Sequence, residues 1–257
     1  MPDAEDIRAI RPEHCAPSRM PAAGPDAAIA RSMINPQKSV ASLVLDHSEC
    51  AAVLQRHRID YCCRGDATLA AACRDRRLDV GVVINELERA ISERRADDDD
   101  DPRELSSPAL LALIVSRYHA PLRRTLPFIR TLAAKVGGVH GEHNPRLIEL
   151  DEIVAELAET LEAHIDDEEA RLFPALAHPR LGVGDLLLAT RDEHSMVGEL
   201  LGRMRTAADE YAVPDWACNS YRTLFRELER LETDVLRHVH LENHVLLPRF
   251  CGDARCA

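Results

Sequence analysis

The chain has 257 residues, a formal net charge of −12, 46% hydrophobic residues and only 4% aromatic residues. This length and apolar content are enough to bury a core in one large domain or two smaller ones. The acidic balance argues against a nucleic-acid partner, because a negative surface repels phosphate. No uninterrupted apolar run of about 18 residues is present, so we expect no transmembrane helix and no membrane partner.

The N-terminus is acidic and lacks the apolar run of a signal peptide. We therefore expect a cytoplasmic protein, whose eight cysteines are thiols, metal ligands or redox groups rather than a disulfide framework. Residues 1–36 are rich in Pro, Ala, Asp and Arg without a helical pattern, which predicts a disordered extension.

Residues 37–95 hold short helical patterns around the sequence RIDYCCRGDATL, which predicts a small helical domain. Residues 96–106 include a run of Asp followed by Pro, which predicts an acidic linker, in effect a solvated charged loop. Residues 251–257 are expected to be a tail after the last domain.

Four long segments between residues 107 and 250 carry apolar residues at steps of three and four, the pattern of an amphipathic helix. Short breaks such as GGVHGEHNP and DEYAVPDW separate them, and short connections favour antiparallel neighbours. We therefore predict an all-α chain, with an up-and-down four-helix bundle over residues 107–250 that follows the small helical N-terminal domain.

Histidine interrupts the apolar stripe of every predicted bundle helix, and two stripes also carry Glu. A lone His on such a stripe is usually a hydrogen-bonded core residue, but a buried Glu without a partner costs several kcal/mol or stays protonated. A metal would satisfy all of these groups together. The candidate ligands are His119, His164, Glu168, His194, His238 and Glu242.

The sequences HIDDEEARLFP and HVHLENHVLLP repeat one frame, in which Glu follows His by four residues and lies on the same helix face. Asp167 could also reach a metal, but the second copy has Leu241 at that position, which favours Glu168. A single His precedes each copy, at His119 and His194. This repetition predicts two metals related by a pseudo-twofold axis.

Imidazoles and carboxylates without thiolate suit Fe, Mn or Zn. Six protein ligands do not fill two octahedra, so positions remain for an oxo bridge, water, O₂ or NO.

Glu169 and His240 are expected on the surface, and Glu193 is either an outer partner of the site or a surface residue. Pro174 and Pro248 are expected to end or kink their helices just past the ligand pairs, with a simple helix end favoured for Pro248, and Pro121 and Pro127 are expected to distort the first helix near His119. We expect structural roles for His140, His143, His178 and His244.

The segments RYHAPLRRTLP, HIDDEEARLFP, RDEHSMVGELL and HVHLENHVLLPRF, preceded by HRIDYCCRGDATLAAAC, resemble the iron–sulfur cluster repair di-iron proteins, also called repair of iron centres proteins. The resemblance implies a hemerythrin-like bundle with a non-haem di-iron centre of two irons per chain, bridged by oxo and carboxylate groups, on the six candidate ligands. It also implies that the chain restores clusters damaged by nitric oxide or peroxide, with iron donation as one route. Damaged iron–sulfur proteins or a cluster-assembly scaffold, NO and O₂ would be the partners, and a homodimer is one expectation.

Cys62 and Cys63 are the second candidate site. Adjacent cysteines do not form a relaxed disulfide, so thiol exchange, NO capture or transient iron handling is the chemistry they suit. The alternative is that one of them is buried and inert. Family members usually have Gly after the pair, where this chain has Arg64, which puts the geometry of the pair in doubt. Cys73 is expected to pack in a core.

Two other functions stay open from the sequence. A hemerythrin-like sensor or carrier would bind NO or O₂, although the cysteine domain argues against a simple carrier. An enzyme could reduce NO, nitrite or peroxide, but it would need an electron donor, and no GxGxxG fingerprint is present.

Overall fold

The structure is a computed structural model that describes residues 33–93, 101–177 and 183–251. The account below concerns the unit Ile34–Ala257. The extension predicted over residues 1–36, the linker predicted over 96–106 and the tail predicted over 251–257 lie wholly or partly outside the described residues, as does His178. The predicted domain boundaries stay predictions.

The prediction of an all-α chain is confirmed, since the described residues contain helices and a single isolated bridge between Ser39 and Thr68. Four short helices come first: α2 (Val40–Asp46), α3 (Cys50–Arg56), α4 (Leu69–Asp75) and α5 (Val80–Glu93). The side chains of Ser39 and Thr68 accept hydrogen bonds from the first-turn amides of α2 and α4. These caps fix where the helices begin.

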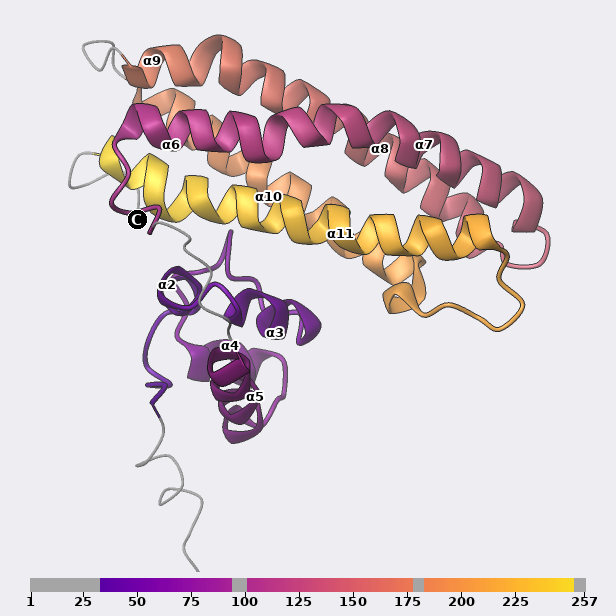
Figure 1. Cartoon of the computed structure of the whole chain (residues 1–257), viewed down its shortest axis with the longest axis horizontal. Coiled ribbons are helices and arrows are strands. Elements are labelled where there is room, and N and C mark those ends of the chain that lie inside the picture. The colour runs from indigo at the N-terminus through magenta and orange to yellow at the C-terminus, as the bar shows by residue number, and fades with distance from the viewer. Residues whose placement is uncertain (1–32, 94–100, 178–182, 252–257) are drawn as a thin grey trace, which may run out of the picture. The chain divides into compact units, whose positions relative to one another are not determined.

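The bundle consists of four long helical rods (Figure 1). The first rod contains α6 (Ser107–Ile114), the π-helical segment η1 (Val115–His119) and α7 (Ala120–His140). The second contains α8 (Arg146–Asp167), the π-helical η2 (Glu168–Leu172) and α9 (Phe173–Ala177), and the third is α10 (Gly184–Ala207), followed by the short 3₁₀ segment η3 (Asp209–Tyr211). The fourth contains α11 (Asn219–Leu241), the π-helical η4 (Glu242–Leu246) and the 3₁₀ segment η5 (Leu247–Arg249).

Neighbouring rods pack in an up-and-down order, with α7 against α8, α8 against α10, and α11 against both α7 and α10. The predicted up-and-down bundle is confirmed by this order. None of the described helices combines the length and the hydrophobicity that crossing a bilayer requires.

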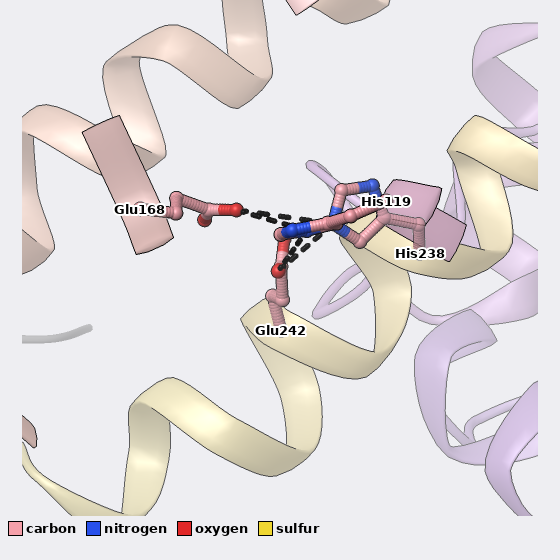
Figure 2. Close-up of side chains that lie close together, drawn as sticks. All are labelled: His119, Glu168, His238 and Glu242. Atoms are coloured by element: carbon pink, nitrogen blue, oxygen red, sulfur yellow. Dashed lines mark hydrogen bonds and ion pairs between the residues drawn. The ribbon is translucent and has the colours of Figure 1, made fainter. Parts of the chain in front are cut away.

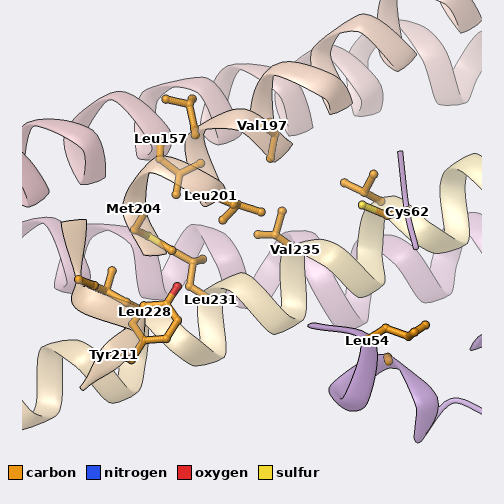
Figure 3. Close-up of a cluster of buried hydrophobic side chains, with 14 of the residues drawn as sticks. Leu54, Cys62, Leu157, Val197, Leu201, Met204, Tyr211, Leu228, Leu231 and Val235 are labelled. Carbon is orange, nitrogen blue, oxygen red and sulfur yellow. The ribbon is translucent and has the colours of Figure 1, made fainter. Parts of the chain in front are cut away.

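Two separate hydrophobic clusters fill the interior. The larger cluster joins α2–α5 to the long middle of the bundle, and Figure 3 shows part of it, including Leu157, Val197 and Val235. The smaller cluster contains Leu110, Leu172 and other residues near the far end of the rods. Along the first three rods the candidate ligands fall between these clusters, and on the fourth rod His238 and Glu242 lie where the two clusters meet. A polar layer thus divides an otherwise apolar core.

The N-terminal helices also contact the bundle through buried polar groups. The side-chain amide of Gln55 on α3 donates to the carboxylate of Glu232 on α11 (3.0 Å), which also accepts from Arg205 and from the Tyr211 hydroxyl. Gln55, Arg205 and Glu232 are all buried. Because such groups are costly when unpaired, this network favours one docked arrangement of α3 on the bundle.

Candidate metal centre

The six candidate ligands come from all four rods and meet in one layer. His119 is the last residue of η1, His164 lies in the last turn of α8, and His194 lies in the middle of α10. His238 lies in the last turn of α11. Glu168 and Glu242 are the first residues of the π-helical segments η2 and η4, so each His-x₃-Glu frame spans the change from α- to π-helix.

Each π-helical segment ends two residues before a proline, at Pro121, Pro174 and Pro248. The amide just before each proline bonds to the carbonyl five residues back, as Phe173 does to Glu168. Proline has no N–H to donate, and its ring collides with the carbonyl four residues back, so a wider turn relieves the conflict. The prolines therefore widen the helix beside a ligand rather than simply ending it, whereas Pro127 lies inside an unbroken α7.

Two groups of four potential ligands share both carboxylates. His119 and His238 form one group with Glu168 and Glu242, and His164 and His194 form the other with the same two residues. Within each group the ligand atoms lie within 4.8 Å of one another. Figure 2 shows the first group converging on one point. Each group thus takes one histidine from each copy of the repeat, and the two metals predicted from the repeat stay a prediction.

The imidazoles face each other through their Nε2 atoms, at 2.9 Å for His119 and His238 and 3.2 Å for His164 and His194. Three of the four rings use Nδ1 for an outer partner: Glu169 for His119 (2.8 Å), Glu193 for His164 (2.7 Å) and the Asn243 side-chain oxygen for His194 (2.8 Å). An Nδ1–H held this way leaves the Nε2 lone pair pointing inward, which is how metal-bound histidines are oriented.

After the orientation of the imidazoles, the carboxylates are the second feature that indicates a cation site. Both oxygens of Glu168 and the Oε2 of Glu242 are buried and have no hydrogen-bond partner among the described residues. An unsatisfied buried polar group costs roughly 1–3 kcal/mol, and more when it is charged. The nearest polar neighbours of these oxygens are imidazole Nε2 atoms, with His194 3.1 Å from Glu242 Oε2 and His119 3.4 Å from Glu168 Oε2. A cation would stabilise these Nε2 atoms and carboxylate oxygens together, so the residues present fit a metal.

The electrostatics of the layer agree with this conclusion. Burial and the neighbouring Glu242 raise the pKa of Glu168 to about 8. Burial alone would lower the pKa of His194, but Glu242 and Glu168 outweigh it and raise that pKa to about 9. The pKa of Glu242 lies well below its usual value, because His238 and His194 oppose the effect of burial. The two carboxylates thus attract positive charge to the Nε2 positions.

The surface prediction was wrong for one of two residues near the layer. Glu169 is partly exposed, with 32% of its side chain accessible, and its carboxylate also accepts from His119 and from Arg123 (2.6 Å). His240 was also expected on the surface, but it is buried and donates from Nδ1 to the main-chain oxygen of Tyr61 (3.0 Å). The partners of both residues come from distant parts of the chain, so helix spacing alone gave no signal for them. Glu193, left open from the sequence, is an outer partner of His164.

The cysteine pair lies beside this layer. Asp60 holds the loop, because its Oδ1 accepts from the amides of Cys62 (3.0 Å) and Cys63 (2.8 Å). The two sulfur atoms are 3.5 Å apart, and the Cys63 sulfur is 3.5 Å from the main-chain oxygen of His194. The hydrogen bond between the thiols raises the pKa of Cys62 and lowers that of Cys63.

Side chains of η4 fasten the same loop to the bundle. The main-chain oxygen of Cys62 accepts from the Asn243 amide (3.1 Å) and from His244 Nε2 (2.8 Å). Asn243 therefore bonds to the cysteine loop and to the candidate ligand His194 with one side chain. The sequence gave no signal for this role of Asn243, and the His244 contact refines its expected structural role.

Arg64 stands where family members usually have Gly, but it does not strain the backbone of the cysteine loop. Positive φ values occur elsewhere in the described residues, but not at Arg64. The glycine that the loop needs is Gly65, where an added Cβ would lie 2.5 Å from His244 Nε2 and 2.5 Å from the Tyr61 oxygen.

Cys73 is buried in the larger cluster, as expected. His140 and His143 pack against Trp216, away from the candidate ligands.

A four-helix bundle whose core layer holds paired imidazoles and shared carboxylates is a cation-binding bundle of the hemerythrin class. The family model described as the hemerythrin HHE cation binding domain matches residues 111–250, and the model described as a domain of unknown function, DUF542, matches residues 36–91. The chain belongs to the family of iron–sulfur cluster repair proteins that have a hemerythrin HHE domain, and it is a metal-binding protein. The resemblance inferred from the sequence is thereby confirmed.

Similar proteins cover most of the chain. The iron-sulfur cluster repair protein ScdA of Staphylococcus haemolyticus (strain JCSC1435) is 30% identical over 223 residues, which are 85% of this chain and 100% of that protein. The iron-sulfur cluster repair protein YtfE of Yersinia pseudotuberculosis serotype IB is 30% identical over 216 residues, which are 82% of this chain and 96% of that protein.

Proposed function

We propose that this chain repairs iron–sulfur clusters damaged by nitrosative or oxidative stress, and that it holds two iron ions to do so. The observation that carries the proposal is the convergence of four Nε2 atoms on two buried carboxylates that both groups share. The names of the similar proteins support the cellular role. The proposed ligands are His119, His164, Glu168, His194, His238 and Glu242.

The protein residues prepare the centre in three ways. Glu169, Glu193 and Asn243 hold three imidazoles in the orientation that a metal requires. The apolar clusters on both sides keep the layer dry, which strengthens its electrostatic interactions. The shared carboxylates place the two metal positions close together. Bound iron would supply a redox-active ion with open positions for NO or O₂, and iron that could be donated to a damaged cluster.

Cys62 and Cys63 form the second part of the proposal, as a pair that handles thiol chemistry or iron near the centre. Their location beside His194 and the lowered pKa of Cys63 support this role, because a thiolate is the reactive form of cysteine. Damaged iron–sulfur proteins or a cluster-assembly scaffold are the proposed partners. The alternative functions, gas sensing and reduction of NO, nitrite or peroxide, have no separate structural observation in their favour.

Iron analysis of the full chain, purified without oxygen from iron-replete cells, tests the centre. We expect about two irons per chain, as in other bundle carboxylate centres, and loss of iron in Glu168→Ala and Glu242→Ala. Glu229→Ala, which removes an exposed carboxylate from α11, is the matched control. Zinc in place of iron, or unchanged iron in both ligand variants, would refute the di-iron assignment.

The repair role needs its own assay. An iron–sulfur enzyme inactivated by nitric oxide should regain activity when the iron-loaded chain is added, and it should not do so with the iron-free Glu242→Ala variant. If an equal amount of free ferrous iron restores the enzyme as quickly, the chain is not a repair protein under these conditions.

A further inference from the structure

A second group of metal-binding side chains lies outside the His/Glu layer. Asp60, Cys62 and Cys63 each present one donor atom, and these three atoms lie within 4.8 Å of one another. Two thiolates and a carboxylate are a different donor set from that of the bundle, which has no sulfur. Such a set prefers divalent metals of intermediate softness, such as Fe²⁺, Co²⁺ and Zn²⁺.

The distances in this group match those around a tetrahedral ion. Metal–sulfur bonds of about 2.3 Å at tetrahedral angles place two sulfur ligands about 3.8 Å apart, and they place sulfur and oxygen ligands about 3.5 Å apart. The two cysteine sulfurs are 3.5 Å apart, and the Cys62 sulfur is 3.2 Å from Asp60 Oδ1. An ion could therefore bind with only small shifts of the side chains.

The loop is also preorganised for this purpose. Asp60 Oδ1 accepts both cysteine amides, which holds the carboxylate over the sulfur atoms. Because the cysteines are adjacent, the pair does not relax into a disulfide, and its structure holds two free thiols. Gly198 on α10 lies beside the pair, and a Cβ added there would be in ordinary van der Waals contact with the Cys63 sulfur, at 3.7 Å.

The group is partly accessible to solvent, although Cys62 itself is buried. Asp60 and Cys63 are half-buried, and Asp60 and Cys62 line a cavity of about 660 Å³ that also contacts Gly198 and Leu201. Three protein donors leave at least one of four positions open. An open position and a nearby cavity are features of a site that exchanges its ion, rather than of a closed structural site.

We propose that Asp60, Cys62 and Cys63 form a second metal site, which binds one divalent ion of intermediate softness and releases the thiol protons as it does so. The hydrogen bonds of Asn243 to His194 and to Cys62 connect this site to the bundle centre. If the proposed function holds, the ion is Fe²⁺ in transit between the bundle centre and a client. The binding of the ion does not depend on that function.

Cobalt titration of the full chain tests the site. Co²⁺ bound by thiolate gives an intense near-ultraviolet charge-transfer band, whereas Co²⁺ in the His/Glu centre gives only weak visible bands because no sulfur ligates it. We expect the thiolate band in the wild type and its loss in Cys62→Ser and Cys63→Ser. Cys218→Ser, which removes another free and exposed thiol, should leave the band unchanged.

Asp60→Asn separates the ligand role of Asp60 from its structural role. Asn can still accept the two cysteine amides, so the loop should keep its shape, but the carboxylate charge is lost. We expect cobalt binding at the thiolate site to weaken at least about tenfold, with unchanged helicity by circular dichroism. Unchanged affinity would remove Asp60 from the site.

The wild-type titration decides the proposal even if a cysteine variant does not fold. Visible cobalt bands without a thiolate band would overturn it, as would a thiolate band that survives in both folded cysteine variants. A chain that contains no iron but shows the band would refute the di-iron proposal and leave this site intact. A chain that repairs clusters without the band would refute this site alone.

Discussion

The sulfur of Cys63 lies 3.5 Å from the main-chain oxygen of His194, so the cysteine loop rests on the turn of α10 that carries a candidate metal ligand. One side chain, Asn243, strengthens this contact by bonding to both sides of it. We therefore expect chemistry at the thiols to be coupled to metal occupancy of the bundle. The sharpest tests of the structure are those that separate these two parts.

Asn243 can be changed so that both of its bonds are removed, or only the bond to Cys62. Asn243→Ala removes both bonds, so we expect weaker metal retention and faster amide exchange in residues 60–65. Asn243→Asp still accepts from His194 but has no donor for Cys62, so we expect loosening of the loop with most of the metal retained. Metal analysis and hydrogen exchange would measure these effects. Equal metal loss in both variants would mean that Asn243 does not act on His194 through this bond.

Glu193 should tune the affinity of the centre although it is not a proposed ligand. Its carboxylate accepts from His164 Nδ1 at 2.7 Å and makes that imidazole a better electron donor. Glu193→Gln keeps an acceptor but loses the charge, so we expect metal affinity to fall by about tenfold or more. Competition with a chromophoric chelator would measure the change. Asp192→Asn, an equal charge change at the neighbouring exposed position, should have no effect.

Glu232 should matter more for stability than any exposed ion pair. Glu232→Ala leaves the buried guanidinium of Arg205 without its main partner, which costs about 3–5 kcal/mol of unfolding free energy. Glu156→Gln breaks the exposed pair with Arg203 and should cost at most about 1 kcal/mol. Urea unfolding of both variants would compare them. A similar cost for the two would show that the Glu232 network does not hold α3 on the bundle.

Asp46 should contribute to stability only above acidic pH. Its carboxylate pairs with Lys38 and with Arg103 (2.7 Å), and the bond to Lys38 is the main reason that its pKa lies below 3.8 despite partial burial. A lowered folded pKa stabilises the fold above the unfolded value of 3.8, and this contribution is lost as the pH falls through the folded value.

Asp46→Asn should therefore be less stable than the wild type at pH 7, and the difference should shrink once the pH falls below 3.8. Urea unfolding across this pH range would measure it. A difference that stays constant with pH would mean that the charge on Asp46 is not what stabilises the contact.

The amino-acid sequence by itself determined the helices of the bundle, because the three- and four-residue steps of apolar side chains predict one buried face for each. It also identified the six residues of the polar layer, since a buried Glu one turn after His is costly without a metal. The repeated frame was enough to choose Glu168 over Asp167. All of these inferences start from the spacing of residues along a helix or from the repetition of that spacing in a second helix.

The tertiary structure decided everything that depends on contacts between segments far apart in the chain. His119 meets Glu169, His194 meets Asn243, and His240 meets Tyr61 only because the rods and the cysteine loop pack in one register. Helix periodicity places a residue on a face, but it does not say which residue of another helix lies opposite. For this reason His240 was predicted on the surface, the bond of Glu169 to His119 was missed, and the contact of the cysteine loop with the polar layer could not be foreseen.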